Sequence, residues 1–203
     1  MSHFKAVRHL RRRDSLLRPE IDRIGRCSLQ PRGGRFSLIA GAILSQQISV
    51  AAAQTIRRKL QSRLPGRRLS AKELLGLSNA DFQACGVSRQ KREYLRHLSQ
   101  HVVDGQLNFR RLVRLPDEEV ISELTRVKGI GRWTAQMFLI FGLGRPDVFA
   151  PDDLGLRNAM VRIYSLSNPT SDDLNAVAAR WSPHRSVASW YLWRYLDNQP
   201  DEC

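Results

Sequence analysis

Cysteine, long apolar runs and acidic residues are all scarce in this chain. Cysteine occurs only at Cys27, Cys85 and Cys203, three widely separated positions with no metal-ligand spacing. The sequence therefore predicts neither a zinc site nor a disulfide framework, and it favours a reducing, intracellular compartment. The apolar stretch Leu38–Leu44 is too short to span a bilayer, and no signal-like apolar segment opens the chain. We expect no membrane partner.

Acidic residues are outnumbered by basic ones. The chain has 33 Lys and Arg against 19 Asp and Glu, for a formal net charge of +14. Such an excess favours a polyanionic partner whose binding weakens as salt rises. With 42% hydrophobic residues in 203, the chain can bury a sizeable core. Its length fits one medium domain or two small lobes.

Alternating strand patterns are also missing, and helix signals recur instead. Five helix starts are predicted from capping residues or from proline before acidic residues. They lie at Ser70, Ser78, Ser88, Pro116 and Thr170. Glycines that predict helix ends are Gly86, Gly105 and Gly142. We expect an all-α protein of roughly nine to eleven helices, with residues 30–37 as a loop.

A glycine-rich turn stands between two predicted helices. One helix should end over Leu124–Val127 and the next should span Arg132–Phe141, leaving Lys128-Gly129-Ile130-Gly131 as a tight hairpin. Glycine permits a turn whose N–H groups face outward, and the following helix adds its positive dipole end. We expect Ile130 to point inward and the turn to hold a phosphate. The alternative is an ordinary helical turn, since two glycines alone are weak evidence.

The triplet Pro151-Asp152-Asp153 follows the hairpin. One aspartate should cap the helix that begins with Leu154, because its side chain can accept the free N–H groups of the first turn. The other would then be available for chemistry. The spacing leaves open which aspartate has which role, and both could simply cap.

Together these motifs resemble the helix–hairpin–helix DNA glycosylase superfamily, and within it the AlkA type of 3-methyladenine DNA glycosylase II. The run Val127–Ala135 and the Pro-Asp-Asp triplet carry the resemblance. Supporting segments are Leu44–Ser49, Gly86–Ser88, Trp181–Trp193 and, weakly, the tail Gln199–Glu202. The N-terminal β-domain of the longer bacterial enzymes has no counterpart in this sequence.

The resemblance implies a two-lobed helical fold with the active site in the cleft between lobes. One lobe would span about 38–142, and segments 1–37 and 143–203 would form the other. It further implies a monomer that acts on damaged double-stranded DNA. The compartment would be the cytoplasm, beside the nucleoid, in a bacterium, or the nucleus in a eukaryote.

The resemblance also assigns site residues. Asp153 would be catalytic, with Asp152 as the helix cap. Gln47 would be the wedge that enters the DNA, supported by Gln46 and Ser49, although Gln46 and Gln47 could merely join two helices. The predicted phosphate contacts are Lys128, Gly129, Gly131, Arg132 and Thr134. No cofactor is required, but the carbonyls of Thr125, Val127 and Ile130 could gather a structural Na⁺ or K⁺.

Position 133 indicates the reaction type. The lyase-competent branch has a lysine there, and an indole cannot form a Schiff base, so Trp133 predicts a monofunctional glycosylase. The iron–sulfur branch is excluded because it needs four clustered cysteines. Trp133 and Trp193 would stack on a cationic methylated base. Met137 replaces the family's pocket tyrosine.

The sequence leaves three alternatives open. Met137 is compatible with another lesion, such as ethenoadenine or hypoxanthine. The hairpin and basic charge alone would suit a non-catalytic protein that binds damaged DNA. The tryptophans of the pocket could instead be core residues, as we expect of Trp181 and Trp190. The five histidines form no ligand set and are interpreted as surface or packing residues.

Overall fold

Helices supply all regular structure in the computed structural model, which describes residues 3–197. The prediction of an all-α protein is therefore confirmed. Thirteen α-helices lie within the described range, more than the nine to eleven expected. The excess consists of short helices, such as the four-residue α8 (Phe109–Leu112), which are too brief to show a periodic pattern. Among the described residues, no helix is long and apolar enough to cross a membrane.

The chain divides into two compact units. The middle unit is Arg32–Gly142, and the terminal unit combines Met1–Pro31 with Leu143–Cys203.

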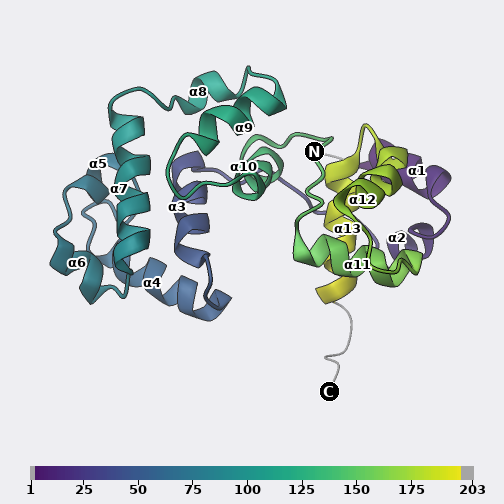
Figure 1. Cartoon of the computed structure of the whole chain (residues 1–203), viewed down its shortest axis with the longest axis horizontal. Coiled ribbons are helices and arrows are strands. Elements are labelled where there is room, and N and C mark those ends of the chain that lie inside the picture. Colours follow the sequence, from purple (N-terminus) through teal and green to yellow (C-terminus); the bar gives the residue numbers. More distant parts are fainter. Residues whose placement is uncertain (1–2, 198–203) are drawn as a thin grey trace. The chain divides into compact units, whose positions relative to one another are not determined.

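The middle unit is built around α7 and α3 (Figure 1). Helix α7 packs on α5 and α3, and α3 also packs on α4 and α10. Leu95 and Leu98 of α7 and Ile39 and Ile43 of α3 are almost fully buried. The bounds of its helices, besides α8, are α3 (Arg35–Ser45), α4 (Val50–Ser62), α5 (Ala71–Leu75), α6 (Asn79–Ala84), α7 (Arg89–Val103), α9 (Asp117–Thr125) and α10 (Arg132–Phe138).

The predicted helix starts are mostly confirmed. The side chains of Ser70, Ser78 and Ser88 accept first-turn N–H groups, and Ser78 forms a full capping box with Asp81. Pro116 differs slightly, because it is the N-cap and Asp117 is the first helical residue. Its ψ of 154° is extended, so the helical backbone begins only after it.

The expectation that a helix ends at Gly142 is wrong. After Phe138 the chain continues as a π-helical segment, Leu139–Leu143, which includes Gly142. A Cβ at Gly142 would lie 2.7 Å from Cδ2 of Phe138 and 3.1 Å from Cδ2 of Leu38. The glycine is therefore explained by close packing inside the segment rather than by a helix end.

The terminal unit is centred on α13 (Arg185–Asp197), which packs on α11 and α2. Its other helices are α1 (Phe4–Arg13), α2 (Arg18–Ile24), α11 (Leu154–Tyr164), α12 (Ser171–Ala178) and a 3₁₀ turn at Ala179–Trp181. Trp181 and Trp190 are buried, which confirms their assignment to the core.

A buried carboxylate joins distant parts of the terminal unit. Asp14, only 1% exposed, accepts hydrogen bonds from Nε1 of Trp181 and Oη of Tyr164, both at 2.7 Å. Burial and the neighbouring Asp14 raise the pKa of Tyr164, which stays a hydrogen-bond donor. These two bonds satisfy the buried carboxylate of Asp14. They also link the end of α1 to α11 and to the 3₁₀ turn.

Candidate functional site

The hairpin of the middle unit depends on one glycine. Gly129 has φ of +89°, and a Cβ there would lie 2.2 Å from Cδ2 of Tyr94. Only glycine fits both the backbone and the ring. Ile130 is 5% exposed, which confirms that it points inward. Its N–H donates to the carbonyl of Val127 at 3.0 Å and closes the turn.

A histidine supports this turn from α7. The N–H of Lys128 donates to Nδ1 of His97 at 3.0 Å. Burial, with smaller contributions from His101 and Lys128, lowers the pKa of His97, so the neutral acceptor form is favoured. No local sequence pattern predicts this contact, because it joins residues 31 apart. His97 is thus more than the surface or packing residue that the sequence suggested.

The predicted phosphate contacts differ in their accessibility. Lys128 and Gly131 are exposed, whereas Thr134 is only 5% exposed and is the least accessible of the set. The guanidinium of Arg132 forms two hydrogen bonds to the carboxylate of Glu118, at 2.9 and 2.6 Å. Lys128 therefore carries the more available positive charge, because Glu118 partly offsets that of Arg132.

The carbonyls predicted to hold a monovalent cation belong to the same turn. The carbonyl of Val127 already accepts one hydrogen bond, from Ile130, and a carbonyl oxygen has two lone pairs. Thr125 is the last residue of α9, where carbonyl groups lack helical partners. Oxygen ligands of this kind suit a hard cation.

The predicted wedge loop is tied to the hairpin. Nε2 of Gln46 donates to the carbonyl of Gly129 at 2.9 Å, across 83 residues of sequence. Gln47 is exposed, with φ of +57° in the left-handed region. Ser49 caps α4 by accepting the N–H of Ala52. Gln46 and Ser49 thus hold the ends of a short loop that presents Gln47.

Trp133 and Met137 lie one turn apart on α10, so they share a face of this helix. Trp133 is 42% exposed, unusual for so large an apolar ring. Met137 is half-buried and lines a cavity of about 310 Å³ within the middle unit, together with Thr134 and Phe138.

In the terminal unit, the expectation that Asp152 caps the helix is wrong, because the cap is supplied by the other aspartate. Asp153, not Asp152, is the N-cap of α11, and its Oδ1 accepts the N–H of Leu156 at 2.8 Å. Asp152 instead accepts a hydrogen bond from Oγ of Ser171 at 3.0 Å. The physical reason is the turn after Pro151: Asp153 has the extended backbone of an N-cap residue, with φ −72° and ψ 118°.

Asp153 also meets Trp193. Nε1 of Trp193 donates to Oδ1 of Asp153 at 3.0 Å, and Asp153 is 8% exposed. A Cβ at Gly155 would lie 3.2 Å from both Oδ1 of Asp153 and Cδ1 of Trp193, so the glycine leaves room for this pair. The terminal unit therefore contains a buried carboxylate held in one orientation by two N–H donors.

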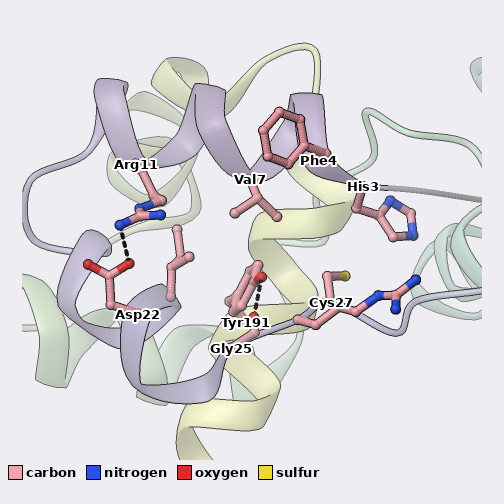
Figure 2. Close-up of a pocket in the computed structure, with 10 residues that line it drawn as sticks. His3, Phe4, Val7, Arg11, Asp22, Gly25, Cys27 and Tyr191 are labelled. Carbon is pink, nitrogen blue, oxygen red and sulfur yellow. Dashed lines mark hydrogen bonds and ion pairs between the residues drawn. The ribbon is translucent and has the colours of Figure 1, made fainter.

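The terminal unit also has a cavity, and none of the predicted site residues lines it (Figure 2). It measures about 380 Å³ and includes His3, Val7 and Cys27 among its lining residues. Two pairs of its polar groups bond to each other: Arg11 to Asp22 at 2.9 Å, and Oη of Tyr191 to the carbonyl of Gly25 at 2.8 Å. Burial raises the pKa of the Cys27 thiol, which disfavours the reactive thiolate.

Comparison with known proteins gives a consistent result. The family model described as "HhH-GPD superfamily base excision DNA repair protein" matches residues 40–184. DNA-3-methyladenine glycosylase 1 of Schizosaccharomyces pombe is 35% identical over 156 residues, which is 75% of this chain and 68% of that protein. The protein YfjP of Bacillus subtilis is 38% identical over 122 residues, but the match spans only 42% of its length.

A solved structure extends the similarity to nearly the whole chain. The 3-methyladenine DNA glycosylase Mag1 of Schizosaccharomyces pombe, in complex with abasic DNA, superposes with a TM-score of 0.86 at 29% identity. The alignment covers 98% of this chain and 99% of that one.

Proposed function

Since the chain belongs to the HhH-GPD superfamily of base excision DNA repair proteins, we propose that it is a monofunctional DNA glycosylase for alkylated purines. Its substrates would be bases of the 3-methyladenine and 7-methylguanine type in double-stranded DNA. The observation that carries the proposal is the buried carboxylate of Asp153, held by the N–H groups of Leu156 and Trp193. The glycosylase relatives support the substrate class.

The damaged base must leave the stack before its bond to the sugar is accessible. Gln47 fills the vacated space as the wedge. Its loop is suited to this role because Gln46 bonds to Gly129 and Ser49 caps α4. The same hairpin binds the DNA backbone through the N–H groups of Gly129 and Gly131 and the side chain of Lys128, while Arg132 remains close to Glu118.

Asp153 acts at the sugar. A water oxygen bonds to C1′ as the bond from C1′ to the base nitrogen breaks, and the electron pair leaves with the base. Positive charge develops on C1′ and the ring oxygen in the transition state, and a preorganised carboxylate stabilises it. The same carboxylate takes the proton of the water. Because Oδ1 is held by two donors, no reorganisation is needed as the charge appears.

The reaction ends at the abasic site. A strand-cleaving lyase needs an amine that forms a Schiff base at C1′, and Trp133 supplies none. The indoles of Trp133 and Trp193 instead attract the positive charge of a methylated purine. Such a base leaves readily, so no strong general acid is required. No cofactor takes part; a Na⁺ or K⁺ held by carbonyls of the hairpin would be structural, and the enzyme acts as a monomer.

The direct test compares two neighbouring aspartates. Asp153→Asn keeps an oxygen that can accept the same two hydrogen bonds but removes the charge. We expect release of 3-methyladenine and 7-methylguanine from methylated DNA to fall about 100-fold or more, with little loss of stability. Asp152→Asn is the matched control and should retain near-normal release, because Asp152 accepts its hydrogen bond from Ser171 and does not cap α11. Full activity of Asp153→Asn would overturn the assignment.

A second candidate is a glycosylase for other lesions. Met137 favours it, because a flexible thioether lines an apolar cavity and adapts to different shapes. Competition between methylated DNA and DNA that contains ethenoadenine or hypoxanthine separates the two candidates. Tight binding of abasic DNA with no base released from any substrate would instead identify a non-catalytic damage-binding protein.

A further inference from the structure

A cavity of the terminal unit is lined entirely by basic side chains. Lys5, Arg8, His9 and Arg12 of α1 line it together with His184, and its volume is about 410 Å³. The four residues of α1 are spaced three, four and seven positions from the first, so they share one face of the helix. The cavity thus gathers three cationic side chains and two imidazole rings without a carboxylate among the lining residues.

One of the two histidines has a buried ring nitrogen without a hydrogen-bond partner among the described residues. Within the described part of the chain, Nε2 of His9 is buried and has no hydrogen-bond partner. The rings of His9 and His184 lie edge to face with centroids 5.3 Å apart. A buried polar atom without a partner is costly, and a bound oxyanion would supply one.

The charged groups around His184 also indicate that the cavity lacks a negatively charged partner. Burial lowers the pKa of His184, with further lowering from His9 and His3 and an opposing effect of Asp147. The oxygens of Asp147 are already occupied by Arg185, at 2.8 and 3.1 Å, and by Oγ of Ser182 at 2.8 Å. Asp147 is therefore committed to another ion pair, and the excess of positive charge in the cavity remains.

We propose that this cavity binds a phosphate group, and that a backbone phosphate of bound DNA occupies it as a contact separate from the hairpin. Arg8 and Arg12 provide planar guanidinium groups that match phosphate oxygens in pairs, and Lys5 adds a point charge. The imidazole rings of His9 and His184 provide further N–H donors. Phosphate binding rests on the cavity alone; only the source of the phosphate rests on the proposed function.

The histidines report binding directly. The imidazole signals of His9 and His184 are followed by NMR during titration with inorganic phosphate at low ionic strength, and then with an undamaged DNA duplex. Both should shift with either ligand, and the pKa of His184 should rise. His97 and His101 lie near the hairpin and report separately on the phosphate contact proposed there. Unchanged His9 and His184 signals with both ligands would overturn the proposal. A response to inorganic phosphate alone would overturn the DNA contact.

The salt dependence of DNA binding gives a second test with a matched pair of variants. Arg12→Gln removes a charge from the cavity, whereas Arg13→Gln removes the same charge from an exposed neighbour that does not line it. Losing one phosphate contact should lower the slope of log K against log salt by about 0.9. We expect this change in Arg12→Gln and not in Arg13→Gln. Equal changes in both would indicate diffuse charge and contradict a defined site.

Release of methylated bases is measured in the same variants with saturating DNA. Arg13→Gln should keep its release rate within about twofold of the unsubstituted protein, because Arg13 is not among the residues that line the cavity and is not a predicted site residue. If neither the unsubstituted protein nor the variants release a base, the proposed function is wrong. The NMR titration of the histidines still tests whether the cavity binds phosphate.

Discussion

At the scale of single residues, Oδ1 of Asp153 accepts two hydrogen bonds, from the N–H of Leu156 at 2.8 Å and from Nε1 of Trp193 at 3.0 Å. The family resemblance assigns both Asp153 and Trp193 to the site, but it implies only that the indole of Trp193 stacks on the base. In the structure its N–H binds Oδ1 of Asp153. Asp153 therefore caps α11 and is also the proposed catalytic residue. The sequence predicts instead that one aspartate caps the helix and the other is catalytic. No local pattern could show the bond between Trp193 and Asp153, because it joins residues 40 apart.

Removing the indole N–H tests this pairing. Trp193→Phe keeps an aromatic face for the base but leaves Asp153 with one fewer donor. A hydrogen bond to a charged group is worth about 1.5–3 kcal/mol, so we expect single-turnover base release to fall at least tenfold. Binding of abasic DNA should change much less. If release falls only in proportion to binding, the N–H bond has no part in catalysis.

At the scale of elements, the hairpin shows which features the sequence could predict. Its glycines and inward Ile130 follow from local backbone chemistry and are seen in the structure. The contacts of Tyr94 and His97 that support it come from α7 and were not predictable from the local pattern. The same holds for Gly142, whose role is close packing against Phe138 and Leu38 rather than ending a helix.

A pair of glycine substitutions separates backbone strain from the contact with Tyr94. Gly129→Ala introduces strain at φ +89° and also a clash with the ring of Tyr94. Gly105→Ala introduces strain at φ +73°, with nothing within 4 Å of the new Cβ. Positive φ costs about 1–2 kcal/mol, so the Gly105 variant should lose about that much unfolding free energy. The Gly129 variant should lose more and bind DNA weakly. Equal losses would show that Tyr94 simply moves aside.

The hairpin should also be sensitive to acid. His97 has a lowered pKa in the folded protein, so its stabilising effect is complete above the unfolded pKa of about 6.5 and is lost as pH falls through the folded value. Protonated Nδ1 can no longer accept the N–H of Lys128. The unfolding free energy should therefore decline below about pH 6.5.

His97→Asn is the comparison for this acid effect, because its side-chain oxygen can accept the same N–H without titrating. His184 also has a lowered pKa and contributes to the decline in both proteins, so the relevant quantity is their difference. The variant should lose less stability between pH 7.5 and pH 5.5 than the unsubstituted protein. Parallel curves would contradict a role for His97 protonation.

At the scale of the whole molecule, sequence composition and motif order were sufficient for the fold class and the family. The helical pattern, the caps and the excess of 33 basic over 19 acidic residues predicted an all-α protein with a polyanionic partner. The residue contacts that shape the site were not predictable in this way. They join segments that meet only in the folded chain, as Gln46 does with Gly129 and Trp193 with Asp153.

The central claim is hydrolysis of alkylated purines from DNA without strand cleavage, and product balance tests it most directly. Methylated duplex DNA is incubated with the protein, free bases are measured by chromatography, and strand breaks are counted before and after alkali. The account predicts free 3-methyladenine and 7-methylguanine in amounts equal to the alkali-labile sites, with strands intact until alkali is added. Strand breaks without alkali, or no free base at all, would contradict it.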